Sequence, residues 1–146
     1  MTKEQIIEKL PYEAPFLFVD EIEEVDENGV KGSYTLKPDE YFYQGHFKDH
    51  PITPGVILTE IMAQIGLVCL GIFTLKEQID KNTIGVAMSS TVINFYKAVL
   101  PGEKVLVKSE KEYFRFNKLK CKVEMFNEEQ KLIAKGEIAG MIVGNS

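Results

Sequence analysis

The feature that most constrains this chain is an almost uninterrupted apolar run over residues 56–75. A helix rises about 1.5 Å per residue, so a helix of this length can cross a bilayer or fill the core of a small domain. Glu60 and Gln64 lie near its start, two glycines lie within it, and no basic flank precedes it. These features disfavour a membrane span. We therefore expect a core helix enclosed by a sheet, and no membrane-spanning segment.

A loop of unusual composition leads into this run. Between Tyr43 and Gly55 the chain carries two histidines, two prolines and two glycines. Pro51 and Pro54 each lack a backbone donor and push the preceding residue toward an extended conformation, so regular structure is excluded here. The free N–H groups of a helix start point at whatever lies in front of it. We therefore expect the functional site at this junction of loop and helix.

Three side chains around the junction are candidates for acid–base chemistry. Glu60 and Gln64 are four residues apart, so they share one face of a helix. Burial raises a carboxyl pKa toward neutrality and histidine titrates near neutrality, which makes His46 and Glu60 a plausible acid–base pair. From the residues alone, His46 could instead brace the loop, Glu60 could reach solvent at the helix start, and Gln64 could be a packed amide.

The set His46, His50 and Glu60 also has the composition of a metal site. However, the prolines exclude a helical His-x-x-x-His arrangement, and the sequence offers no obvious fourth ligand. We therefore expect no metal.

Composition limits the class of protein. A chain of 146 residues, 45% hydrophobic and 27% charged, is expected to form one globular domain over residues 1–146. Its net charge of −5 argues against nucleic acid as a partner. Cys69 lies in the apolar run and Cys121 in a predicted strand, which favours reduced, packed thiols over a disulfide framework. The first ten residues are charged and show no apolar leader, so we expect a cytoplasmic location.

Local patterns predict an α+β protein. Thr2 and Gln5 form a capping-box pattern for a short helix that ends near Leu10. Alternating apolar residues and turn signals predict strands over residues 16–24, 30–36, 83–95, 104–114, 119–126 and 132–143, with a polar connector over residues 76–82. Two strands, one long helix and about four further strands form an α+β pattern, in which an antiparallel sheet can hold the helix in its concave face.

The segment QGHFKDHPITPGVILTEIMAQ, from Gln44 to Gln64, resembles the 3-hydroxyacyl-acyl-carrier-protein dehydratases of the FabZ type. The resemblance fixes residue types over the whole loop and the first helical turns. It also takes in Leu10-Pro11, Pro15-Phe16-Leu17, Val19-Asp20 and the turn Pro101-Gly102-Glu103, and it covers nearly the whole chain. The matching positions in the segment are Gly45, His46, Phe47, Pro51, Pro54, Gly55, Val56, Glu60, Met62, Ala63 and Gln64.

This resemblance implies a fold, an assembly and an activity. The fold would be the hot-dog fold, an antiparallel sheet wrapped around one long central helix. The assembly would be a homodimer with a continuous sheet, often extended to a trimer of dimers. The activity would be removal of water from (3R)-3-hydroxyacyl thioesters to give trans-2-enoyl thioesters, without a metal or an organic cofactor. The partner would be an acyl carrier protein whose phosphopantetheine holds the acyl chain, in fatty acid or related lipid or polyene biosynthesis.

The resemblance also implies roles for single residues. His46 would take the proton at C2, while Glu60 would protonate or orient the departing hydroxyl together with a histidine of the other subunit. Gln64 would hold the Glu60 carboxyl. The backbone N–H of Gly55 would bind the thioester oxygen, and Lys97, where the family is basic, would contact the carrier protein.

Some positions depart from the family pattern. Lys48 and Asp49 replace a Pro-Gly pair after His-Phe, and Glu13 and Glu21 replace arginines, which points to a specialised pathway more than to the housekeeping enzyme. Two alternatives stay open. A hot-dog thioesterase would activate water with a carboxylate and release free thiol. A non-catalytic acyl-binding subunit of a synthase would not need both His46 and Glu60.

Overall fold

The apolar run forms one continuous helical segment that occupies the centre of the molecule. It consists of α2 (Gly55–Ala63), a π-helical turn η2 (Gln64–Val68) and α3 (Cys69–Thr74). At the π turn, the Cys69 N–H donates to the Gln64 carbonyl, five residues back. The hydroxyl of Ser109 on the facing strand donates to the Gly66 carbonyl at 2.7 Å. The sheet thus supplies a buried partner where the helical ladder changes its spacing.

The computed structural model describes residues 1–77 and 84–144. Within them, six antiparallel strands form one sheet in the order β1-β2-β4-β5-β6-β3. Two further helical segments, α1 (Lys3–Glu8) and the 3₁₀ helix η1 (Tyr41–Gln44), lie outside the sheet. The strands are β1 (Glu21–Asp26), β2 (Gly29–Thr35), β3 (Ile84–Phe95), β4 (Lys104–Arg115), β5 (Lys118–Asn127) and β6 (Leu132–Gly144).

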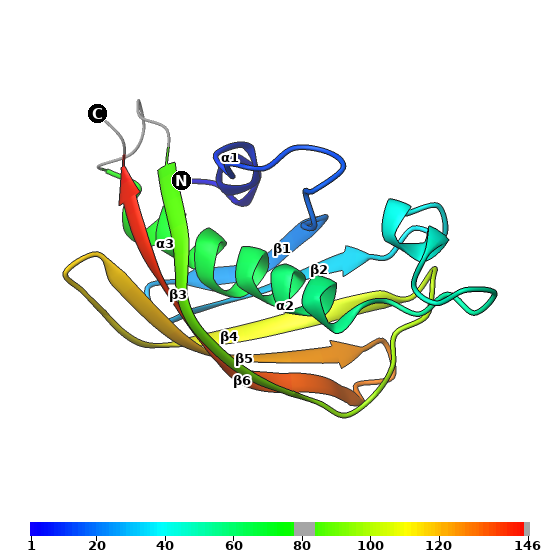
Figure 1. The fold of residues 1–146 in the computed structure, drawn as a ribbon. Coiled ribbons are helices and arrows are strands. Elements are labelled where there is room, and N and C mark those ends of the chain that lie inside the picture. The colour runs from blue at the N-terminus through cyan, green and yellow to red at the C-terminus, as the bar shows by residue number, and fades with distance from the viewer. Residues whose placement is uncertain (78–83, 145–146) are drawn as a thin grey trace.

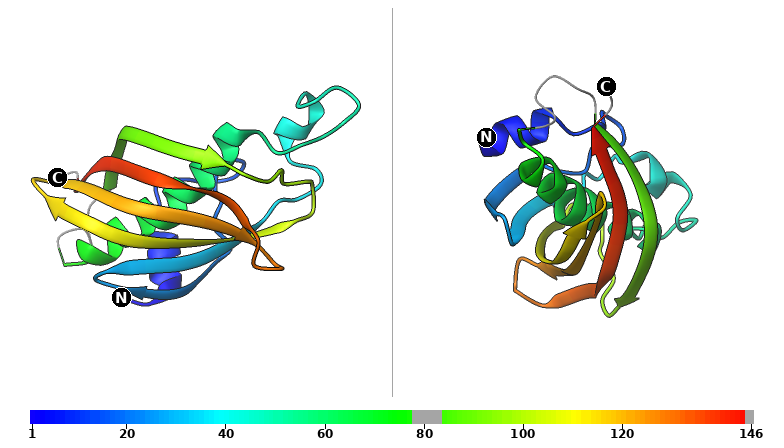
Figure 2. Two further views of the ribbon diagram at one scale, coloured as in Figure 1. Left: turned by 90° about the horizontal axis from the view of Figure 1, so that it is seen from below. Right: turned by 90° about the vertical axis from the view of Figure 1, so that its left-hand side faces the viewer.

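The sheet curls around the central helix, which lies in its concave face (Figures 1 and 2). Alternate residues of the strands, such as Val107 on β4 and Val123 on β5, meet the buried helix in a single core. Gly66 allows this close approach, because a Cβ there would lie only 3.0 Å from a methyl of Val123. The predicted α+β architecture, a sheet wrapped around one long apolar helix, is therefore confirmed.

The central helix is long and apolar enough to cross a membrane by length and composition. In the structure, 78% of the most apolar 18-residue stretch of this helix is buried inside the molecule. This position is typical of a core helix.

Most element boundaries agree with the sequence-based prediction, with one instructive exception. Residues 16–20 are not part of a strand, since β1 begins at Glu21. Only Asp20 at the end of this stretch reaches a neighbouring strand, where its N–H donates to the Ser33 carbonyl of β2. Earlier in the stretch the backbone binds a side chain: the Phe18 N–H and the Phe16 carbonyl both contact the amide of Gln64. The predicted connector over residues 76–82 and the predicted strand residue Thr83 lie largely outside the described residues.

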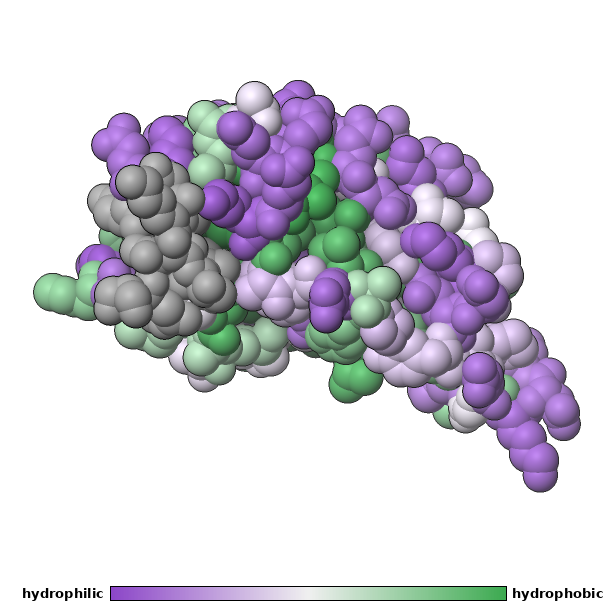
Figure 3. All heavy atoms as spheres, turned by 90° about the horizontal axis from the view of Figure 1, so that it is seen from above, coloured by the Kyte–Doolittle hydropathy of each residue, from purple (hydrophilic) through white to green (hydrophobic). Residues whose placement is uncertain are grey.

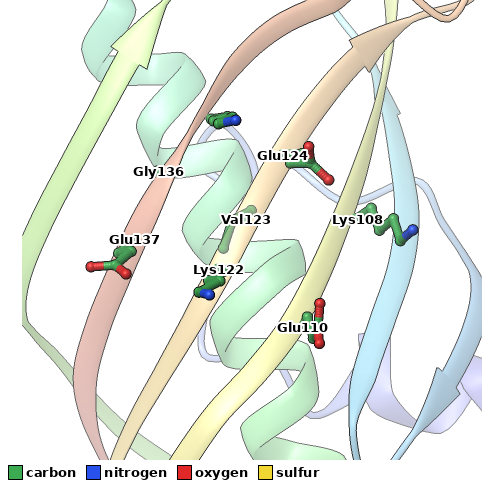
Figure 4. Close-up of a pocket in the computed structure, with 8 residues that line it drawn as sticks. Lys108, Glu110, Lys122, Val123, Glu124, Gly136 and Glu137 are labelled. Carbon is green, nitrogen blue, oxygen red and sulfur yellow. The ribbon is translucent and has the colours of Figure 1, made fainter.

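The convex face of the sheet is covered by charged side chains of both signs. Lys108 and Glu110 on β4 face Lys122 and Glu124 on β5, around a surface hollow of about 430 Å³ (Figure 4). Nearby, the Lys120 ammonium lies 3.5 Å from the Glu112 carboxylate. Balanced, exposed charges of this kind are typical of a solvated sheet face and not of an apolar ligand site.

Strand β3 forms one edge of the sheet and pairs with β6 on its inner side. Its described side chains from residue 87 onward are mostly exposed, although several are apolar. Val92 is 68% exposed, and Met88, Phe95 and the following Tyr96 are also exposed. An apolar edge strand is a surface on which another strand can pair.

Candidate active site

The loop that carries His46, residues 45–54 between η1 and α2, is called the His46 loop. It is a narrow hairpin that projects beyond the start of α2 (Figure 1). Its arms are joined by the Ile52 N–H, which donates to the His46 carbonyl at 2.8 Å, and by two reciprocal backbone bonds of 3.0 Å between Phe47 and His50. Lys48 and Asp49 form the tip, where Asp49 has a φ of 61°. Aspartate tolerates this left-handed conformation, so the pair can make the turn without the glycine that the family pattern has there.

His46 is half-buried, and its ring orientation is defined by the loop. Its Nδ1 lies 2.9 Å from the carbonyl oxygen of Ile52, while the Phe47 ring stacks on the imidazole with centroids 4.1 Å apart. A carbonyl can only accept, so Nδ1 carries the proton and donates. In the neutral ring Nε2 then has a free lone pair and can accept a proton.

Gly55 is the first residue of α2, directly after the N-cap Pro54. It is exposed, and a Cβ added to it would lie 3.5 Å from the ring of Phe95 on β3. The backbone N–H groups of a helix start have no partner within the helix. The Gly55 N–H is therefore available to an acceptor in front of the helix.

Glu60 and Gln64 project from the same face of the helix and are hydrogen-bonded. The fully buried Gln64 donates from Nε2 to Glu60 Oε2 at 3.0 Å and to the Phe16 carbonyl at 3.0 Å. Its Oε1 accepts from the Phe18 N–H at 2.8 Å. Burial raises the pKa of Glu60 above its usual value, and the donation from Gln64 offsets part of that rise.

A cavity of about 230 Å³ lies beside the Glu60 carboxyl. Its walls come from the N-terminal segment, the central helix and β3. Its lining residues are Tyr12, Phe16, Glu60, Ala63, Leu67, Val68, Val86 and Met88. Seen from above, this face of the molecule carries a strip of hydrophobic residues between hydrophilic ones (Figure 3). The cavity lining therefore combines one carboxyl with a mostly apolar wall, a composition typical of small-molecule sites.

The structure brings some of the predicted site residues together and leaves others apart. Glu60 and Gln64 form one hydrogen-bonded pair. His46 belongs to the loop and is not among the residues that line the cavity beside Glu60. Lys97 is exposed in the bend after β3. Within residues 1–77 and 84–144, no cluster of three or more His, Cys, Asp or Glu could hold a metal ion.

Tyr12 is a site residue that the sequence patterns did not indicate. It lines the cavity, and burial, followed by the nearby Glu60 carboxylate, raises its pKa to about 12. The phenol therefore stays protonated near neutral pH and can donate a hydrogen bond. It lies 48 residues before Glu60 in sequence, so no local pattern could have joined the two.

Comparison with known proteins identifies relatives along most of the chain. The family described as "FabA-like domain" matches residues 10–139. A 3-hydroxyacyl-[acyl-carrier-protein] dehydratase FabZ from Petrotoga mobilis is 36% identical over 138 residues, which cover 94% of this chain and 95% of the relative. The protein of the same name from Caldicellulosiruptor bescii is 39% identical over 108 residues, which cover 73% of this chain and 74% of the relative.

Solved structures share the fold at low sequence identity. The dehydratase heterocomplex ApeI:P from Xenorhabdus doucetiae has a TM-score of 0.79 at 15% identity, covering 97% of this chain and 91% of that one. A thioesterase from Haemophilus influenzae has a TM-score of 0.70 at 15% identity, covering 99% of this chain and 92% of that one. These likenesses support the hot-dog fold alone. The family match and the FabZ relatives go further: the chain belongs to the FabA-like family of hot-dog dehydratases.

Proposed function

We propose that this protein removes water from (3R)-3-hydroxyacyl thioesters on acyl carrier protein and produces trans-2-enoyl thioesters. The observation that carries the proposal is the Glu60 carboxyl, which is held by Gln64 at the wall of an apolar cavity in a chain of this family. FabZ relatives are named for this reaction, which supports the choice of substrate. Fatty acid or related lipid or polyene biosynthesis in the cytoplasm is the proposed setting.

Glu60 is the proposed acid. Because burial raises its pKa, a larger fraction of the carboxyl is protonated at a given pH than for an exposed glutamate. An acid that gives its proton to a departing hydroxyl must start protonated. The amide of Gln64 fixes the direction of the carboxyl.

His46 is the proposed base, through Nε2. It takes the C2 proton, and the released electron pair forms the C2–C3 double bond while the C3–O bond breaks. The hydroxyl leaves as water with the proton from Glu60. In this proposal the N–H of Gly55, the first residue of α2, binds the thioester oxygen as negative charge develops on it. These steps need no oxidant, reductant or cofactor.

The active site is proposed to be shared between two chains of a homodimer. In one chain His46 does not line the cavity beside Glu60, whereas the exposed strand β3, which lines it through Val86 and Met88, is a free edge. Pairing of two β3 edges would extend the sheet across a two-fold axis and bring a neighbour's loop toward the cavity. Three such dimers could assemble into a hexamer.

A single spectrophotometric assay tests the function. A 3-hydroxyacyl carrier thioester is expected to develop enoyl absorbance without releasing thiol. Thiol release would identify a thioesterase, and neither signal would identify an acyl-binding subunit. Loss of His46 (His46→Ala) or of the Glu60 acid (Glu60→Gln) is expected to lower the rate at least about 10²-fold, the lower end for a general acid or base.

A further inference from the structure

The two arms of the His46 loop are joined at their base by a buried pair of hydroxyl groups. Tyr43 ends the segment that enters the loop, and Thr53 begins the segment that leaves it. Their side-chain oxygens lie 2.5 Å apart, and the residues are 8% and 3% exposed. Neither residue has a role in the chemistry proposed above.

The pair lies in a well-anchored part of the fold, and the loop tip does not. The Thr53 N–H donates to the Val99 carbonyl at 2.9 Å, and the Tyr43 ring packs edge-on against Phe42 with centroids 4.8 Å apart. In contrast, residues 47–51 at the tip are all exposed. The direction of the loop is therefore determined largely at its base.

The position of the Tyr43–Thr53 pair affects the His46 imidazole through the short chain segments that connect them. Ile52 directly precedes Thr53, and its carbonyl accepts from His46 Nδ1 while its N–H donates to the His46 carbonyl. Tyr43 lies three residues before His46 on the other arm. Any separation of the arms would move the Ile52 carbonyl away from Nδ1. The ring would then lose the bond that keeps its proton on Nδ1 and leaves Nε2 free.

We propose that Tyr43 and Thr53 are positioning residues for His46. Their hydrogen bond holds the loop arms at the separation at which Ile52 selects the Nδ1-protonated ring. The bond is buried, so water does not readily replace it when one hydroxyl is removed. The catalytic part of this inference rests on the proposed function, whereas the effect on the ring is a property of the loop itself.

The test uses near-isosteric changes that delete one hydroxyl each: Tyr43→Phe, Thr53→Val, and the two combined. Tyr41→Phe is the matched control, because Tyr41 lies in the same 3₁₀ helix but is exposed. Thr53→Ser is the rescue variant, since it keeps the hydroxyl. Ring nitrogen chemical shifts report the tautomer directly. The chain has two histidines, and His50→Gln assigns their signals.

The wild-type His46 ring is expected to be mainly Nδ1-protonated when neutral. Thr53→Val and Tyr43→Phe should both shift the His46 ring toward the mixture of Nδ1- and Nε2-protonated tautomers of a free imidazole. The ring nitrogen shifts of the exposed His50 should stay unchanged. In the dehydration assay each variant should lose about tenfold or more in kcat at nearly constant KM, as expected for a misplaced catalytic group. The double variant should lose no more than the worse single variant, and Thr53→Ser should recover most of the rate.

Unchanged His46 shifts in both single variants would overturn the proposal, whatever the activity. Equal losses in Tyr41→Phe, or losses that multiply in the double variant, would also overturn it. A wild-type protein without dehydratase activity would instead refute the proposed function. In that case the ring spectra still decide whether the pair holds His46.

Discussion

At the scale of single residues, the proposed oxyanion donor, the Gly55 N–H, can be tested by mutation, because a backbone donor can be deleted at this position without breaking the helix. Gly55 is the first helical residue, a position where proline is favoured, and Pro54 before it is already extended, with φ −60° and ψ 140°. Gly55→Pro is expected to lower kcat by about 10²–10³-fold, the typical cost of one oxyanion donor. Stability should change little.

Gly55→Ala is the matched control. It keeps the N–H, and its Cβ would meet the Phe95 ring at 3.5 Å, an ordinary contact distance. Its activity should stay within a few-fold of the wild type. If the alanine and proline variants lose the same activity, the N–H has no role and the site merely requires a glycine.

The Gln64 amide gives a prediction for pH dependence. Its donation to the Glu60 carboxylate favours the charged form, so removing it in Gln64→Leu should raise the Glu60 pKa further. Activity that needs protonated Glu60 is lost as pH rises through that pKa. The alkaline limb of the kcat profile should therefore move to higher pH. A shift to lower pH would contradict the role of Gln64 as donor to Glu60.

At the scale of elements, the β4–β5 hairpin turn carries an unfavourable residue. Phe116 and Asn117 have φ values of 52° and 63°, and Phe116 is 93% exposed. A left-handed conformation costs a bulky residue about 1–2 kcal/mol, and asparagine tolerates it. Phe116→Asn should therefore raise the free energy of unfolding by about 1 kcal/mol, measured by denaturant titration. Asn117→Ala, which removes an asparagine from a left-handed position, should lower the free energy of unfolding. A lower value for Phe116→Asn together with a higher value for Asn117→Ala would refute this account.

Elements were predictable from sequence where the pattern is local. The capping box at Thr2 and Gln5, the turn between the strands predicted over residues 104–114 and 119–126, and the apolar helix are all present, because each depends on neighbours in the chain. The prediction of a strand over residues 16–20 was wrong, because the backbone of Phe16 and Phe18 bonds to the side chain of Gln64, more than 40 residues away. Such a long-range partner leaves no periodic signal in a single sequence.

In the candidate site, too, the features that depend on neighbours in the chain could be predicted, and those that depend on distant segments could not. The positions of Gly55 at the helix start and of Gln64 beside Glu60 follow from helix geometry, and the structure agrees with both. The cavity wall at Tyr12 and the buried partner of Thr53 depend on how distant segments fold together. These parts needed the tertiary structure.

At the scale of the whole molecule, recognition of the carrier protein is proposed to involve Lys97. It is exposed in the bend after β3, and carrier proteins present acidic surfaces. Lys97→Glu should raise KM for the carrier-linked substrate but not for a small thioester analogue. Lys108→Glu, on the convex sheet face, serves as the control and should change neither value (Figure 4). Equal effects of Lys97→Glu on both substrates would exclude Lys97 from the interface.

The shared site is the central claim at this scale: His46 of one chain and Glu60 of the other form one acid–base pair. If so, a heterodimer of His46→Ala with Glu60→Ala has one intact site and one site with both defects. A heterodimer of the wild type with the double variant has one defect in each site. The two heterodimers contain the same two substitutions. In the first they lie on different chains, and in the second they lie on the same chain.

The most direct measurement is the dehydration rate of these two heterodimers, purified after co-expression with two tags. The first should recover about half of the wild-type rate per dimer, and the second should be nearly inactive, as the symmetry of a two-fold dimer requires. The reverse result, an inactive first heterodimer and a half-active second one, would show that each site is built from a single chain.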